Sequence, residues 1–276
     1  MRRAAAIAIL AVAALAAAAG GGERAQRLAR SANIAQRLAR LRGELPEIRR
    51  RAGWSERHAL IDAVADCVTT ERVGRLADGG KWLCNGHRLA PPCVVYGVGA
   101  GTDISFEQAM ADKFGCDVHV FDPTPSSRKL FGALESGRRY GAGKVTFHPW
   151  GLGPVSRDPA QVRRLTLEGV ACEVKTLDEM AALLGHDRID VLKMDVEGGE
   201  FPILADLLER SLLHRLRIDQ LMIEFHTPDA ASFLEFVRLF EALTDADYLL
   251  HRKEFNPFAA FTCAEYAFAR RAYLLD

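Results

Sequence analysis

Carboxylates and one histidine follow two apolar segments in the second half of the chain. Asp195 and Glu197 come directly after a predicted strand at 189–194 and precede two consecutive glycines. Glu224 and His226 close the next apolar run. Such groups could hold an ammonium group, favour a sulfonium cation or accept a proton from a substrate. His226 is a candidate general base, because an imidazole titrates near neutral pH; the alternative is a structural hydrogen bond.

Three alternating glycines mark a turn earlier in the chain. Gly97, Gly99 and Gly101 follow the apolar run 94–96 and precede a helical pattern that starts at Ser105. Glycine permits a tight turn and a close approach of a ligand to the backbone. Doubly wound α/β domains hold nucleotide-bearing cofactors with a strand, a glycine turn and a helix in this order. Many glycine turns, however, only connect a strand to a helix.

Two further positions suit an adenosine group. Asp122 ends the apolar segment 117–121, 23 residues after Gly99, and an acid at such a place can accept hydrogen bonds from both ribose hydroxyls. The alternative for Asp122 is a turn and helix cap. Trp150 could stack on a purine whose edge meets the Gly151 amide, or could equally be an ordinary core aromatic residue.

The elements that must position these residues alternate between strand and helix patterns. Strands are predicted at 93–97, 117–121, 145–148, 189–194, 220–225, 248–251 and 262–269, and helices at 105–114, 125–136, 177–184, 200–210 and 229–244. Residues 164–167 and 173–175 predict a surface hairpin. The last two strands are joined by a loop too short for a crossover helix, so they should pair antiparallel. We expect an α/β fold with a mostly parallel seven-stranded sheet and one antiparallel strand near the C-terminus.

Composition bounds the class of protein. The 276 residues suffice for one large domain with a full core. Lysine plus arginine and aspartate plus glutamate both number 36, so no global charge indicates a nucleic-acid partner. Six cysteines show no zinc-binding spacing. Disulfides are allowed if the chain is secreted, but Cys93 and Cys263 lie in apparent strands and are interpreted as buried thiols.

The N-terminal part of the chain divides into three segments. Residues 1–22 contain an uninterrupted apolar run at 4–19 behind two arginines, which predicts a signal peptide or signal anchor; a transit peptide is the alternative. Residues 23–52 are basic and predict a solvated helical stalk. Residues 53–276 form the expected domain, in which 53–92 is a cap with a helical pattern. The chain is therefore expected in the secretory pathway, secreted or attached to a membrane through 4–19.

Taken in order, five motifs resemble those of the FkbM-type methyltransferases, closest to the methyltransferase-like branch whose animal members carry an N-terminal signal or anchor. The similarity spans roughly residues 80–270, and its most specific part follows the strand at 189–194. The motifs lie at 96–101, 120–124, 147–153, 189–201 and 223–226.

The resemblance implies a class I Rossmann-like enzyme that uses S-adenosylmethionine and usually methylates oxygen. The implied cofactor-binding residues are Tyr96, Gly97, Gly99, Gly101, Asp103, Asp122, Trp150, Gly151 and Asp195, and the candidate catalytic residues are Asp195, Glu197, Glu224 and His226. Many relatives carry an acid where this chain has Gly97. That acid usually holds the methionine amino group, so either Asp103 or Asp195 substitutes for it or the chain binds the cofactor weakly.

Other functions compete with this interpretation. A non-catalytic binding protein of the same fold would explain the missing acid at Gly97. A nicotinamide-dependent oxidoreductase is disfavoured, because position 102 of its expected glycine motif is Thr102. A metal-dependent methyltransferase could use Asp195 and Glu224, but the sequence shows no complete ligand set, so no metal is predicted. The expected partner is a small-molecule or glycan acceptor, and not a nucleic acid.

Overall fold

A computed structural model describes residues 23–76, 79–155, 164–256 and 262–275 of the chain. The predicted signal segment at 1–22, with its apolar run at 4–19, lies outside these ranges. Within them, no helix has both the length and the apolar character needed to cross a membrane.

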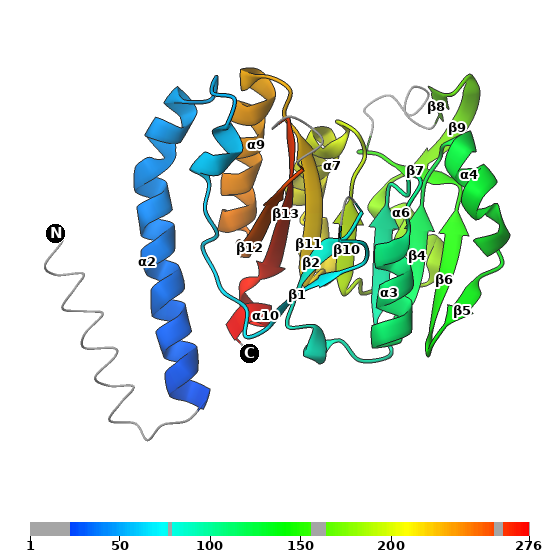
Figure 1. The fold of residues 1–276 in the computed structure, drawn as a ribbon, viewed down its shortest axis with the longest axis horizontal. Helices are drawn as coiled ribbons and strands as arrows, with labels where there is room; N and C mark the ends of the chain where they lie inside the picture. Colours follow the sequence, from blue (N-terminus) through cyan, green and yellow to red (C-terminus); the bar gives the residue numbers. More distant parts are fainter. Residues whose placement is uncertain (1–22, 77–78, 156–163, 257–261, 276) are drawn as a thin grey trace, which may run out of the picture.

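One large sheet organises the molecule (Figure 1). Its strands lie in the order β12 (Tyr248–Phe255), β13 (Cys263–Arg270), β11 (Gln220–His226), β10 (Val191–Met194), β3 (Val94–Val98), β4 (Asp117–Phe121), β6 (Gly143–His148) and β5 (Arg138–Tyr140). Neighbours from β11 to β6 pair parallel, whereas β13 is antiparallel to both β11 and β12. The predicted antiparallel strand is thus confirmed. The short edge strand β5, antiparallel to β6, is an eighth strand that was not predicted.

Two layers cover the sheet because successive side chains of each strand point to opposite faces. The first face carries the hairpin of β1 (Thr70–Val73) and β2 (Lys81–Cys84), α3 (Ser105–Phe114), α4 (Pro125–Phe131) and the 3₁₀ turn η3 (Gly132–Leu134). The second face carries α6 (Leu177–Leu184), α7 (Glu200–Glu209), α8 (Leu212–Arg215), α9 (Ala230–Asp245) and, further out, α2 (Glu23–Arg50) and α10 (Arg271–Leu275).

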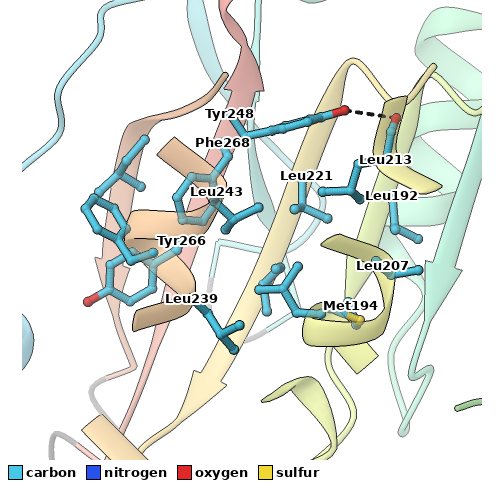
Figure 2. Close-up of a cluster of buried hydrophobic side chains, with 14 of the residues drawn as sticks. Leu192, Met194, Leu207, Leu213, Leu221, Leu239, Leu243, Tyr248, Tyr266 and Phe268 are labelled. Atoms are coloured by element: carbon cyan, nitrogen blue, oxygen red, sulfur yellow. Dashed lines mark hydrogen bonds between the residues drawn. The ribbon is translucent and has the colours of Figure 1, made fainter. Parts of the chain in front are cut away.

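The core of the second face shows how the strands hold these helices. Leu192 and Met194 of β10 and Leu221 of β11 project into a cluster with leucines of α7, α8 and α9 (Figure 2). The Tyr248 hydroxyl donates to the carbonyl oxygen of Leu213 at 3.0 Å, which satisfies the polar end of a buried aromatic ring.

A small second sheet lies next to the carboxyl end of β4. It consists of β7 (Trp150–Leu152), β9 (Val170–Lys175) and β8 (Arg164–Leu167), and its β8–β9 pair is the predicted surface hairpin. The predicted helix at 125–136 is divided between α4 and η3, while α3 and α6 have the predicted bounds.

The predicted solvated stalk is wrong in one respect. Residues 23–50 do form a helix, α2, but it packs along α9 (Figure 1). Its buried side chains belong to the core of the second face: Ile34, Leu38, Leu41, Leu45 and Ile48. Burying each such side chain contributes about 1.5–3 kcal/mol. Salt bridges from Arg42 to Asp245 and from Arg49 to Glu241 join the two helices at their edges. The helix is therefore part of the folded body.

The predicted helical pattern of the cap is also wrong. Apart from the 3₁₀ turns η1 (Arg57–Leu60) and η2 (Gly86–Arg88), residues 53–92 form the β1–β2 hairpin and an extended segment at 61–67, here called the strap. The amides of Val64 and Ala65 in the strap both donate to the carbonyl oxygen of Leu250 in β12. The apolar residues spaced three apart therefore belong to an extended chain that lies along β12, and not to a helix.

Two disulfides join neighbouring elements. Cys93 at the start of β3 is bonded to Cys116 just before β4, and Cys67 of the strap is bonded to Cys84 of β2. The prediction of a buried thiol is thus wrong for Cys93, because β3 and β4 are adjacent and bring the two sulfurs together. It is confirmed for Cys263, which is free and buried.

Candidate active site

The predicted carboxylates meet on the first face of the sheet, at its carboxyl edge. Asp195 follows β10, and Glu224 of the neighbouring β11 lies in register with Glu265 of β13. Carboxylate oxygens of Asp195, Glu224 and Glu265 lie within 4.8 Å of one another. Glu265 was not predicted, because its position depends on the antiparallel pairing of β13 with β11.

A buried lysine neutralises part of this charge. Lys81 of β2 is 2% exposed, and its ammonium group contacts the Glu265 carboxylate. Burial acts to lower the pKa of Lys81, but the charges of Glu265 and Asp195 outweigh it and raise that pKa. The hairpin therefore places the positive charge of Lys81 where the three carboxylates would otherwise attract a metal ion.

The pKa values of the three carboxyl groups are shifted in different directions. Burial raises the pKa of Asp195, and burial raises the pKa of Glu265 to about 7 against the attraction of Lys81. Burial also acts to raise the pKa of Glu224, but hydrogen bonds from the Cys263 thiol at 2.8 Å and the Asn256 amide at 3.1 Å outweigh it and lower that pKa. The two groups also act on each other, because the charge of Glu224 further raises the pKa of Asp195 while Asp195 helps to lower that of Glu224.

His226 belongs to the same edge but is not a base at neutral pH. Its Nδ1 lies 2.9 Å from Oε1 of the fully buried Glu200, and its Nε2 lies 3.4 Å from Oε2 of the exposed Glu197. The hydrogen bond with Glu200 raises the pKa of His226 to about 9. The side chain is thus a cation at pH 7, and the interpretation of His226 as a general base does not agree with its surroundings.

The glycine turn lies between the two predicted cofactor acids. A Cβ at Gly99 would stand 1.7 Å from the carbonyl oxygen of Asp195, so only glycine lets the turn meet the end of β10. On the other side, Asp122 Oδ2 accepts from the amides of Ala100 at 2.8 Å and Gly101 at 3.1 Å. The structure therefore brings Asp122 and Asp195 to opposite sides of one turn.

The Asp122 carboxylate already accepts hydrogen bonds from the protein at the oxygens that would bind a ribose. Its second oxygen, Oδ1, accepts from the Thr124 amide at 2.8 Å and the Thr124 hydroxyl at 2.6 Å. A carboxylate oxygen has two lone pairs, so all four acceptor sites of Asp122 are used. Ribose hydroxyls could bind here only by replacing some of these hydrogen bonds.

A buried glutamate of α3 stands where the sequence lacks an acid. A Cβ at Gly97 would lie 2.4 Å from Glu107 Oε1, so the carboxylate of Glu107 occupies the space that a side chain at position 97 would take. Glu107 is 1% exposed, and Lys193 Nζ lies 3.4 Å from its Oε1. That oxygen accepts no hydrogen bond from any residue in the described ranges. The sequence did contain a signal, because Glu107 shares a helix face with the apolar Met110 and Ala111.

The remaining predicted cofactor residues have structural partners. Tyr96 is fully buried on the second face, with its hydroxyl 2.7 Å from His186 Nδ1. Asp103 accepts at 2.6 Å from the amide of Ser105, the first residue of α3, and pairs with Arg75 at 3.1 Å. The Asp103 carboxylate thus already has two protein partners.

Trp150 and Gly151 lie in β7 beside the end of β4. The half-buried Trp150 ring stacks on His148 at 4.9 Å, and Lys175 Nζ lies 4.9 Å from the ring centroid. A Cβ at Gly151 would lie 3.1 Å from a side-chain atom of Pro123, the residue after Asp122. The two residues thus lie near Asp122, but the Trp150 ring already has protein partners.

Comparison with known proteins gives the following matches. Residues 43–270 match a family described as a methyltransferase domain. Over 135 residues the chain is 32% identical to "Probable methyltransferase-like protein 24" of Homo sapiens and to that of Rattus norvegicus. These matches cover 49% of this chain but only 32% and 33% of the relatives, so the chain spans about a third of the length of the curated relatives it matches.

Solved structures are similar at low sequence identity. A fibrillarin pre-rRNA processing protein of Methanococcus jannaschii is 13% identical, with a TM-score of 0.42 over 66% of this chain and 68% of its own. A magnesium protoporphyrin IX methyltransferase from Synechocystis PCC 6803, solved with bound S-adenosylmethionine, is 15% identical, with a TM-score of 0.37 over 67% and 72%.

Proposed function

Because this chain belongs to a family of methyltransferase domains, we propose that it transfers a methyl group from S-adenosylmethionine to an oxygen of a small-molecule or glycan acceptor. The family match and the order of the strands establish a class I methyltransferase fold with an added edge strand, β5. One observation carries the proposal: two carboxylates, the buried Glu107 and the half-buried Asp195, stand on the first face of the sheet beside the glycine turn.

The residues present fit the methionine end of this cofactor. S-adenosylmethionine bears an ammonium group and a sulfonium centre, and buried carboxylates favour both. Glu107 Oε1, which accepts no hydrogen bond from the described residues, suits the ammonium group. Asp195 suits the same end of the cofactor from β10. At the adenosine end, Asp122 would exchange hydrogen bonds with the turn for bonds with ribose.

The carboxylates at the carboxyl edge of the sheet can also accept the proton that an acceptor loses. Bound S-adenosylmethionine supplies an electrophilic methyl group on a positively charged sulfur. An acceptor hydroxyl loses its proton as its oxygen forms the new bond to carbon, and Glu224, ionised at neutral pH, can receive that proton. Lys81 and Asn256 hold the carboxylates in place, and the alignment of the acceptor supplies most of the acceleration.

Calorimetry tests the cofactor directly. We expect the full-length chain to bind S-adenosylmethionine and S-adenosylhomocysteine but not a nicotinamide dinucleotide. Asp195→Asn should weaken binding, whereas Asp62→Asn, whose carboxylate is 85% exposed on the strap, should not. An absence of heat with millimolar S-adenosylmethionine, on protein shown to be folded by circular dichroism, would refute the proposal.

A non-catalytic binding protein is the second candidate, and the saturated hydrogen bonds of Asp122 favour it. An acceptor screen with methyl-labelled cofactor separates the two. Transfer of label that Glu224→Gln abolishes supports the enzyme. Cofactor binding without transfer across small alcohols, phenols and glycans supports the binding protein.

We further propose that the chain belongs to the FkbM-type methyltransferases and enters the secretory pathway, secreted or attached to a membrane through residues 4–19. The two disulfides support this compartment, because disulfides persist in oxidising environments. Thiol counting by mass spectrometry on protein from its native source should find only Cys172 and Cys263 free. Six free thiols would refute the secretory assignment.

A further inference from the structure

A cluster of histidines lies on the second face of the sheet, away from the carboxylates of the candidate active site. His119 projects from β4, His148 from β6, and His186 from the loop between α6 and β10. Asp117, the first residue of β4, adds a half-exposed carboxylate at the amino edge of the parallel strands. The cluster is therefore separated from Asp195 and Glu224 by the sheet, because it lies on the opposite face.

Three groups of this cluster converge on one point. One ligand atom each of Asp117, His119 and His186 lies within 4.8 Å of the others. His119 Nε2 stands 3.5 Å from Asp117 Oδ2. Two ligands about 2.0–2.1 Å from a tetrahedral zinc ion are about 3.3–3.4 Å apart. The separation of the nitrogen and the oxygen is thus close to that required by a shared ion.

The His119 ring is buried with one nitrogen unused. The residue is 7% exposed, and its Nε2 makes no hydrogen bond with any residue that the structure describes. Burial, together with the neighbouring His186 and His148, lowers the pKa of His119 to about 3. A buried polar atom left in this way indicates a ligand.

The Nδ1 atoms of His119 and His186 have partners that can accept their hydrogens. His119 Nδ1 lies 2.9 Å from His148 Nε2, and His186 Nδ1 lies 2.7 Å from the Tyr96 hydroxyl. If each Nδ1 donates its hydrogen, the Nε2 lone pair of each ring is free. Metal-binding histidines are commonly oriented in this way by a partner at the second nitrogen.

The charges around the cluster also favour a cation. Three carboxylates surround the histidine cluster, and one exposed lysine opposes them. The carboxylates of Asp117, Glu135 and Asp187 act on these rings, opposed by the exposed Lys144. An added divalent ion would meet a net negative surrounding.

We propose that Asp117, His119 and His186 bind one zinc ion, with water as the fourth ligand. Imidazole nitrogens and a carboxylate oxygen are ligands that zinc accepts in tetrahedral sites. The ion would tie the start of β4 to the loop that precedes β10, behind the cofactor turn. Its role is to stabilise the fold, because no candidate catalytic residue touches it.

Zinc titration of the full-length chain tests this site. After removal of metal with a chelator, we expect one zinc ion per chain in competition with a chromophoric indicator, a tetrahedral cobalt absorption spectrum and a higher melting temperature with zinc. Asp117→Asn and His186→Gln should each weaken zinc binding by about tenfold to a hundredfold or more. Asp117→Asn changes a half-exposed side chain, so this variant remains a test if His186→Gln does not fold.

His226→Gln is the matched control, because His226 could bind a metal at the rim with Glu224 and Cys263. Zinc binding unchanged by His226→Gln supports the proposed site. No binding at micromolar zinc overturns the proposal. Equal binding by Asp117→Asn and the parent chain, or a loss of binding only in His226→Gln, also overturns it, since the ion would then lie elsewhere.

Discussion

Moving an acid between Gly97 and Glu107 tests whether the two positions share one carboxylate site. Gly97→Asp places a carboxylate where Glu107 Oε1 already lies, 2.4 Å from the new Cβ, which real Cβ contacts essentially never show. Glu107→Ala removes the carboxylate partner of Lys193, which is 3% exposed and keeps only its hydrogen bond to the Gly99 carbonyl oxygen. Breaking such a buried pair costs about 3–5 kcal/mol of stability. Losing one charge-assisted hydrogen bond to the cofactor costs about 1.5–3 kcal/mol, which is about 10–150-fold in Kd.

The double variant should be better than either single variant. Position 97 of β3 is the register partner of Lys193 in β10, so an aspartate introduced there can pair with that lysine once Glu107 is removed. We expect urea unfolding to show that the double variant regains at least half of the stability lost by Glu107→Ala. Calorimetry should show a parallel recovery of S-adenosylmethionine affinity, since the acid again stands beside the glycine turn.

The double-mutant cycle separates two explanations. Recovery of stability without recovery of cofactor affinity would show that Glu107 serves only as the partner of Lys193. A double variant no better than Glu107→Ala in both measurements would refute the shared site altogether. A matched control, Glu209→Ala at the end of α7, should leave both quantities unchanged.

Three further predictions concern stability. Because the pKa of His226 is raised from 6.5 to about 9, its contribution is present below about pH 6.5 and is lost as pH rises through 9; His226→Gln should lower unfolding free energy by about 1–2 kcal/mol at pH 6, reduced by partial exposure, and by nothing at pH 10. Replacing Cys93 and Cys116 together by alanine opens a disulfide that spans 23 residues and should cost about 3 kcal/mol in urea unfolding; an equal stability would refute the bond. Ile48→Ala in α2 should cost about 2–4 kcal/mol, whereas the 45% exposed Leu28→Ala should change stability by less than about 0.5 kcal/mol; equal effects would mean that α2 does not pack on α9.

Local patterns sufficed for the main elements of the sheet and its helices. The bounds of α3 and α6 and the antiparallel pairing of β13 followed from apolar periodicity and from a loop too short for a crossover. The same patterns misled in the strap, because residues three apart also suit an extended chain held on the edge strand β12. Periodicity reports which residues are buried, but in a short segment it does not report what buries them.

The sequence by itself determined that Asp122, Asp195 and Glu224 end strands and so meet at one edge, because parallel strands place their carboxyl ends together. Only the tertiary structure decided which groups join them. Lys81 and Glu107 arrive from a hairpin and a helix that pack over the same face. Protonation and cysteine pairing also depend on contacts between residues far apart in the chain, which local spacing does not encode.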